Sequence, residues 1–203
     1  MILKDHSEVI IRQRKEWGEI LLDIETRNKY EIKAADGSAL GFAAEQGKGF
    51  LGFLARGFLG HWRSFHIHFF DASKNLVFIA HHPFRWIFGR LDIKDQNGQK
   101  LGAIQQRFSF FRKRFDVENA LGKVVLECKS PWFRFWTFPI KNLQDVEQGR
   151  IEKKWSGGLK EIFTDADNFR VLFSGNELDG EEMRRVLLAA AIFIDLNYFE
   201  KKN

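Results

Sequence analysis

Four segments of the sequence combine arginine and lysine with phenylalanine and tryptophan. They are residues 46–70, 81–90, 107–115 and 129–141, and the first and last contain no acidic residue. Aromatic rings suit the interface between water and lipid, and each cation near an anionic membrane contributes about 1 kcal/mol. These residue types therefore favour a surface that docks on a phospholipid membrane and binds anionic headgroups. The side chains that we assign to this surface are Phe50, Phe53, Arg56, Phe58, Trp62, Arg63, Phe84, Arg85, Trp86, Phe88, Arg112, Lys113, Arg114, Trp132, Arg134 and Trp136.

Two other interpretations fit the same residues. In the first, the rings close the protein core and the cations are ordinary solvated surface. In the second, the cations bind the phosphates of a nucleic acid while the rings stack on its bases. Residues 50–54, Phe-Leu-Gly-Phe-Leu, are more apolar than a stacking groove requires. A membrane is therefore the preferred partner and nucleic acid the less favoured one.

A pair of aspartates offers a different chemistry. Asp165 and Asp167 lie two residues apart between Phe163 and Phe169, so on an extended chain their carboxylates would share one face. Paired carboxylate oxygens can bind a hard cation such as calcium, and we take Asp165, Asp167 and Asn168 as the candidate metal residues. The alternative is a turn before the last strand, in which the aspartates cap backbone groups.

The sequence carries no strong signature of covalent catalysis. It has no nucleophile elbow, no Walker phosphate loop and no HExxH zinc motif. Gly47 to Gly52 matches the GxGxxG pattern, but no strand–helix–strand unit surrounds it. His66 and His68 would share one face of a strand without cysteine pairs nearby, and Cys128 is expected in the core. We therefore expect a protein that is not an enzyme.

The composition indicates a folded, basic protein. The chain has 203 residues, of which 44% are hydrophobic, enough for one domain with a sizeable core. Its 22 phenylalanines and 6 tryptophans favour strands, and its net charge of +5 favours a polyanionic partner. One cysteine and an N-terminus without a long apolar run predict an intracellular location.

A pattern of strand, polar turn and strand recurs about six times. The turns are expected at residues 36–37, 73–75, 97–98, 119–122 and 148–149, and residues 169–173 open a weaker sixth unit. Asn97-Gly98 is the strongest signal because both residues tolerate positive φ. Six hairpins imply about twelve antiparallel strands, which are too many for a small open sheet and favour a closed barrel.

An apolar helix follows the hairpins. Glu181 and Glu182 would place two acids in its first turn, where they suit the helix dipole. Residues 186–194 are nine consecutive apolar residues, and Asp195 ends the run. A spanning helix needs ~20 apolar residues, whereas a shorter helix that is apolar on all sides is typical of a core. We therefore expect a central helix over 180–199, buried inside the barrel.

The two ends of such a barrel would differ in charge. In an uninterrupted meander the hairpin turns lie at one end, which we call the turn end, and the links between hairpins lie at the other, the link end. The turn end would collect the acids Asp36, Asp71, Asp95, Glu118, Asp145 and Glu147. The link end would collect the four basic aromatic segments. We therefore expect the link end to contact the cytoplasmic face of a membrane peripherally.

Several segments resemble the phospholipid scramblase family. They are residues 28–33, 42–45, 149–157 and 163–169, together with the end of the helix at 193–195. The resemblance runs in order from about residue 10 to residue 200. It implies the tubby-like fold, a twelve-stranded barrel around a hydrophobic C-terminal helix. It also implies one domain over 1–203, with a lead-in over 1–20.

The resemblance further implies ATP-independent, non-selective movement of phospholipids between leaflets, stimulated by calcium. The calcium segment of the family corresponds to Asp165, Asp167, Phe169, Val171 and Phe173. As an EF-hand loop this segment is poor, because Phe169 and Phe173 offer no side-chain oxygen. Any calcium affinity is therefore expected to be weak.

Animal scramblases carry cysteine clusters that can be palmitoylated, and here the corresponding positions hold rings. These positions are residues 50–58, 84–88 and 132–136. We expect permanent rings and cations to replace the lipid anchor, as in a minimal, bacterial-type member of the family. One short helix cannot form a pore, so lipid movement would require self-association into a homo-oligomer. The rival function is a module that binds anionic lipid or tethers partners without moving lipid.

Overall fold

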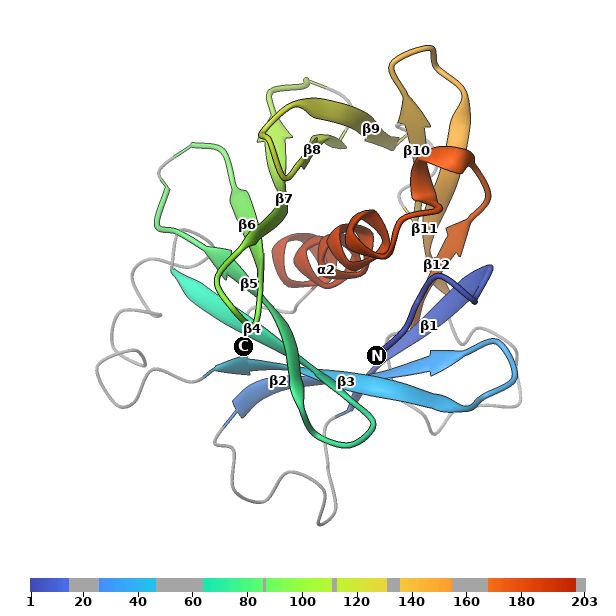
Figure 1. The fold of residues 1–203 in the computed structure, drawn as a ribbon. Helices are drawn as coiled ribbons and strands as arrows, with labels where there is room; N and C mark the ends of the chain where they lie inside the picture. Colours follow the sequence, from blue (N-terminus) through green and yellow to red (C-terminus); the bar gives the residue numbers. More distant parts are fainter. Residues whose placement is uncertain are drawn as a thin grey trace, which may run out of the picture.

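A closed barrel of antiparallel strands surrounds a long C-terminal helix in the computed structural model (Figure 1). The structure describes residues 1–14, 26–46, 64–85, 87–110, 113–130, 136–154 and 168–199. The described residues form 12 strands, each paired with its neighbours in sequence, and β1 pairs with β12 to close the barrel. The predicted fold class, a tubby-like barrel around the C-terminal helix, is confirmed.

The strands follow one another as an uninterrupted meander. Their bounds are β1 Glu8–Arg14, β2 Thr26–Ala34, β3 Ala39–Gln46, β4 Phe65–Asp71, β5 Leu76–His82, β6 Arg90–Asp95, β7 Lys100–Arg107, β8 Lys113–Asn119, β9 Val124–Ser130, β10 Thr137–Asn142, β11 Glu147–Lys154 and β12 Asn168–Phe173. Buried and less buried residues alternate along β4, β9 and β12, as expected for strands with one face on a core. β1 lies within the segment expected as a lead-in, and it is part of the barrel wall.

Asp or Asn side chains shape the five tight turns at the turn end. At the turn between β4 and β5, Asp71 Oδ1 accepts hydrogen bonds from the backbone N–H groups of Ser73 and Asn75, both at 2.9 Å. The bonds from Asn75 lower the pKa of the Asp71 carboxyl. The equivalent side chains at the five turns are Asp36, Asp71, Asp95, Asn119 and Asn142. Part of the acidity of the turn end therefore comes from the chemistry of its turns.

The prediction of a turn at Gln148-Gly149 is wrong. The turn lies at residues 143–146, where Asn142 Oδ1 accepts from the backbone of Val146, and Gly149 lies inside β11. A Cβ on Gly149 would lie 2.4 Å from the carbonyl oxygen of Leu172 in β12. Glycine is therefore needed here because β11 and β12 approach closely, and it does not mark a turn.

One other expectation about the barrel is corrected. The unit opened by residues 169–173 is not a sixth hairpin, because β12 pairs with β11 on one side and with β1 on the other. Glu118 is the next-to-last residue of β8, beside the β8–β9 turn, and its carboxylate pairs with Arg90 of β6. The barrel is thus closed by a contact between the two ends of the meander.

The helix α2, Glu181–Tyr198, lies inside the barrel and follows a short 3₁₀ helix, η3 Asn176–Leu178 (Figure 1). Every residue from 186 to 195 is buried, which confirms the predicted burial of the helix. Near its start Arg184 donates hydrogen bonds to the carbonyl oxygens of Leu3, His6 and Leu178. This buried guanidinium ties the beginning of the helix to the N-terminal residues at the turn end.

Candidate functional site

The link end carries a ridge of exposed apolar side chains on two neighbouring connections. Ile87 lies on the β5–β6 link, and Phe108 and Phe110 lie on the β7–β8 link. Their exposed fractions are 78%, 64% and 83% respectively. The rings of Phe108 and Phe110 meet edge to face at 4.8 Å, and Phe88 packs edge-on against Phe108 at 6.4 Å. We call Ile87, Phe108 and Phe110 the apolar ridge.

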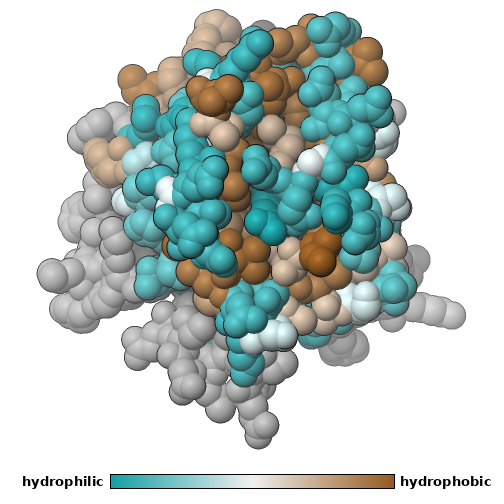
Figure 2. Space-filling model, in the orientation of Figure 1, coloured by the Kyte–Doolittle hydropathy of each residue, from teal (hydrophilic) through white to brown (hydrophobic). Residues whose placement is uncertain are grey.

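Apolar exposure by itself does not distinguish the two ends of the barrel. Ile2, Leu121, Leu143 and Val146 are also exposed, and they lie at or beside the turn end. On the face drawn in Figure 2, hydrophobic residues form separate patches among hydrophilic ones. Among the described residues, the exposed hydrophobic side chains of the link end include phenylalanine rings close in sequence to cations, whereas those of the turn end are aliphatic.

The structure places seven of the predicted site residues. Phe84 and Arg85 are exposed on the β5–β6 link, close in sequence to the ridge. Arg114 forms an ion pair with Glu127 at 2.6 Å, so its guanidinium is partly engaged within the wall. Trp136 stacks on Phe199, the residue that follows α2, with ring centroids 5.0 Å apart. Phe88, Lys113 and Asn168 are the other three.

The remaining predicted residues lie outside the described part of the chain. They are Phe50, Phe53, Arg56, Phe58, Trp62, Arg63, Trp86, Arg112, Trp132, Arg134, Asp165 and Asp167. Their roles in lipid or calcium binding stay predictions. Asn168 begins β12, and its Oδ1 is buried without a hydrogen-bond partner among the described residues. Those residues contain no group of three or more His, Cys, Asp or Glu side chains that could hold a metal.

Lys113 points towards the end of the helix. Its Nζ lies 4.0 Å from the centroid of the Tyr198 ring and 4.7 Å from that of Phe199. Burial lowers the pKa of Lys113, and the nearby positive charge of Lys153 lowers it further. Both ammonium groups lie by the C-terminal end of α2, where the helix dipole favours cations.

A buried polar cluster ends the apolar part of α2. Asp195 is 1% exposed, and its Oδ2 accepts a hydrogen bond from the hydroxyl of Tyr30 at 3.1 Å. Its Oδ1 lies 3.5 Å from Nζ of Lys153, and that ammonium lies 4.1 Å above the ring of Phe199. Strands β2 and β11 thus hold the last turn of the helix through one carboxylate.

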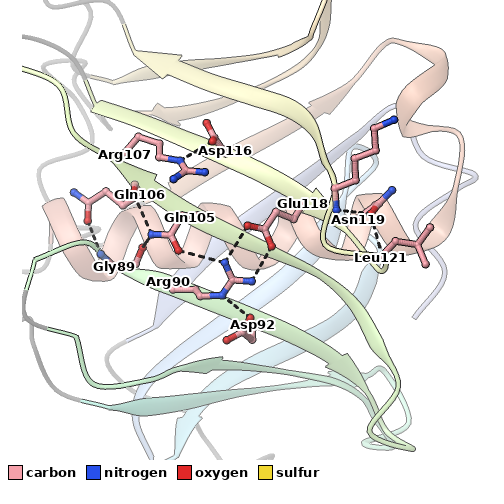
Figure 3. A network of polar contacts seen from close by, with 11 residues as sticks. Gly89, Arg90, Asp92, Gln105, Gln106, Arg107, Asp116, Glu118, Asn119 and Leu121 are labelled. Carbon is pink, nitrogen blue, oxygen red and sulfur yellow. Dashed lines mark hydrogen bonds and ion pairs between the residues drawn. The ribbon is translucent and has the colours of Figure 1, made fainter.

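The wall beneath the ridge is fixed by a network of ion pairs (Figure 3). Arg90 on β6 donates to both carboxylate oxygens of Glu118 on β8, at 3.0 and 2.7 Å, and reaches across β7 to do so. It also donates to Asp92 at 2.8 Å. The hydrogen bonds with Glu118 raise the pKa of Arg90, and those with Arg90 lower the pKa of Glu118. Bidentate pairs of this kind hold β6, β7 and β8 in register.

Comparisons with known proteins fit this architecture. A protein-family model described as Scramblase matches residues 1–201. The chain belongs to the scramblase family. It is 31% identical over 206 residues to human phospholipid scramblase 2, covering 95% of this chain and 67% of that protein. It is 30% identical over 211 residues to human phospholipid scramblase 1, covering 98% of this chain and 64% of that protein. This scramblase-family chain therefore spans about two thirds of the length of these relatives.

A solved structure of a protein from Arabidopsis thaliana is similar to the barrel. The TM-score is 0.50 at 15% sequence identity, over 94% of this chain and 91% of the plant protein. At this identity the likeness concerns the fold alone. Membership of the scramblase family implies interaction with a phospholipid membrane. Among the described residues of this family member, no helix has both the length and the apolarity to cross a bilayer.

Three features of this scramblase-family protein were not predicted from the sequence: the exposed ridge, the orientation of Lys113 and the buried contacts of Asp195. The ridge residues Phe108 and Phe110 lie in the basic aromatic segment 107–115, so their composition already signalled them. The inward orientation of Lys113 has no signal in the sequence. Asp195 was noted as the end of an apolar run, although a lone acid followed by a further helical turn also predicts a buried polar contact.

The Asp195–Lys153 contact can be tested by a double-mutant cycle. Asp195→Leu should lower the free energy of unfolding by about 3–5 kcal/mol, because it removes the carboxylate that lies 3.5 Å from the buried Lys153 ammonium. Asp195→Leu combined with Lys153→Met should cost less, because no buried charge remains. Urea unfolding followed by tryptophan fluorescence measures both.

The exposed pair Glu147–Arg150 serves as the matched control. Glu147→Ala should change the unfolding free energy by less than about 1 kcal/mol. If the Asp195→Leu, Lys153→Met protein is less stable than Asp195→Leu alone, the proposed cost of the buried charge is wrong.

Proposed function

We propose that this scramblase-family protein docks on phospholipid membranes through its link end and promotes movement of phospholipids between leaflets. The movement needs no ATP, does not select among headgroups and involves no covalent catalysis. The cytoplasmic face of the membrane is the proposed surface. The observation that carries the proposal is the apolar ridge of Ile87, Phe108 and Phe110, together with the exposed Arg107, which directly precedes Phe108 in the chain. The names of the human relatives support the lipid class.

The ridge offers enough apolar surface to hold a protein on a bilayer. Full burial of one phenylalanine side chain is worth about 1.5–3 kcal/mol, so Phe108 and Phe110 together would contribute a few kcal/mol. Cations at the same end add about 1 kcal/mol each near anionic lipid. The two contributions together favour reversible, peripheral docking.

The filled interior constrains how lipid could move. Residues 186–195 of α2 occupy the barrel axis, and the strand side chains around them are buried. A polar headgroup therefore has no route through the barrel. We propose that several copies wedge their ridges into one leaflet and thin the bilayer from outside. Self-association is part of this mechanism, because one ridge disturbs little lipid.

Calcium is proposed as a weak, stimulating ligand. The support within the described residues is Asn168, whose Oδ1 is buried and has no described hydrogen-bond partner. An amide oxygen of this kind suits a hard cation, and Asp165 and Asp167 would supply the carboxylates. These residues would hold the ion at the link that precedes β12, on the proposed docking side of the barrel.

A second candidate function is a lipid-binding or tethering module. The filled barrel interior favours this function, because it supports surface binding without any path for headgroups. Docking would then be the whole activity. The two functions predict the same membrane contact and differ only in transbilayer movement.

The docking contact predicts a difference between the two ends. Phe108→Ser with Phe110→Ser should weaken binding to phosphatidylcholine–phosphatidylserine vesicles by at least about tenfold, because two inserted rings are lost. Co-sedimentation over a range of lipid concentrations measures the affinity. The matched control is Leu121→Ser with Leu143→Ser at the turn end, which should bind as the parent protein does. Equal losses in both double variants would contradict docking through the link end.

Lipid movement itself is tested with pure protein in vesicles that carry a fluorescent phospholipid in both leaflets. Dithionite bleaches the outer leaflet, so the bleached fraction should rise above one half when the protein moves lipid. Added calcium should speed the rise, and Asp165→Asn with Asp167→Asn should remove that acceleration alone. If the bleached fraction stays near one half in both conditions while the protein remains bound, the module function is correct and scrambling is not.

A further inference from the structure

A pocket of about 300 Å³ opens at the link end beside the apolar ridge. Its walls come from the β5–β6 link, the end of β7, the β7–β8 link, the start of β8 and the last residue of α2. Nine residues line it, of which three are cationic and none is acidic. Its volume is at the lower end of the range for small-ligand sites. The pocket is therefore lined by positive charge, and it lies next to the apolar ridge.

The cations of the pocket are not equally compensated. Arg107 forms an ion pair with Asp116 and Arg114 forms one with Glu127, both at 2.6 Å, from outside the pocket lining. Lys113 has no carboxylate partner among the described residues, and its Nζ contacts the faces of aromatic rings. The lining therefore holds about one uncompensated positive charge, located on Lys113.

A hydroxyl next to Lys113 has a hydrogen to donate. Gln106 Nε2 donates to the Tyr198 hydroxyl oxygen at 2.9 Å, so that oxygen already accepts one hydrogen bond. No described residue accepts the Tyr198 O–H hydrogen. Burial raises the pKa of Tyr198 to about 12, so the hydroxyl stays protonated near neutral pH. Gln106 is itself fixed, because its Oε1 accepts from the backbone N–H of Gly89 at 3.0 Å.

The pocket is therefore rich in donors and poor in acceptors. An ammonium without a carboxylate and a hydroxyl hydrogen without an acceptor both suit an oxyanion that carries one negative charge. Burial and the Lys153 charge lower the pKa of Lys113, and a bound anion would offset both effects. A phosphodiester has this charge and this set of acceptor oxygens.

The rim of the pocket identifies the source of the phosphodiester. Ile87 and Phe108 belong both to the pocket lining and to the exposed apolar ridge. A ligand that fills the pocket with its anionic group would thus lay an adjoining apolar part along these side chains. A free phosphate has no such part, whereas a phospholipid in a membrane has acyl chains close to its phosphodiester.

We propose that this pocket binds the phosphodiester of a membrane phospholipid, with Lys113 and the Tyr198 hydroxyl as its ligands. The inference rests on the proposed docking of the link end. Glycerophospholipids with an esterified headgroup all carry a phosphodiester, so a site for this group fits lipid movement without selection among those headgroups. The pocket thus adds a specific lipid-binding site, at the end of α2, to the proposed docking surface.

Vesicle binding by two point variants tests the pocket. Lys113→Gln should weaken binding to phosphatidylcholine–phosphatidylglycerol vesicles about tenfold, because a charge-assisted hydrogen bond is lost. Tyr198→Phe should weaken it about fivefold, because the ring remains and only the hydroxyl is removed. Lys123→Gln at the turn end is the control of equal charge and should bind as the parent protein does. Thermal unfolding confirms that each variant is folded.

The outcomes separate the pocket from the docking proposal. If the parent protein does not bind the vesicles, docking and pocket both fail. If it binds, but Lys113→Gln weakens binding no more than Lys123→Gln and Tyr198→Phe has no effect, docking stands and the pocket is wrong. In a further arm, millimolar inorganic phosphate should leave the protein bound. Release by inorganic phosphate would make the pocket a site for free phosphate and overturn the lipid assignment.

Discussion

The packing of an apolar helix inside a closed sheet is the interaction on which the rest of this structure depends. About eight strands make a barrel that side chains alone can fill, so a barrel of 12 strands needs further apolar volume. Residues 186–194 supply it, because they are apolar on every side of α2 and all are buried. Arg184 and Asp195 fix the two ends of the helix through buried polar contacts. The helix is thus a structural part of the barrel.

A filled barrel leaves its ends as the places where function can vary. The turn end is constrained, because an Asp or Asn side chain holds the backbone of each tight turn. The described residues of the links show no repeated Asp or Asn of this kind, and rings and cations occupy them instead. The meander topology therefore separates a structural end from an end suited to lipid contact. The Arg90–Glu118 pair links β6 to β8, the strands next to the connections that carry the apolar ridge.

Much of the fold could be predicted because the local sequence patterns agree with the tertiary structure. Asn97-Gly98 predicts a turn, the alternation along the strands indicates a half-buried sheet, and nine consecutive apolar residues predict a core helix. The error at Gln148-Gly149 arose because glycine serves both reversals and close strand contacts, and only the position of Leu172 distinguishes them. The contacts of the candidate site were harder to predict from the sequence. The orientation of Lys113 depends on where the helix ends relative to β8, which is a tertiary distance that no local pattern encodes.

The most direct test asks whether the helix stays inside the barrel when the protein is on a membrane. Cys128 is the only cysteine, it is buried in the core, and burial raises the pKa of its thiol, so maleimide labelling in solution should be slow. We expect equally slow labelling of the parent protein bound to phosphatidylserine-containing vesicles, because the link end docks while α2 remains in place. Rapid labelling upon vesicle binding, at a rate near that of the unfolded chain, would show that the barrel opens and would contradict docking of an intact barrel.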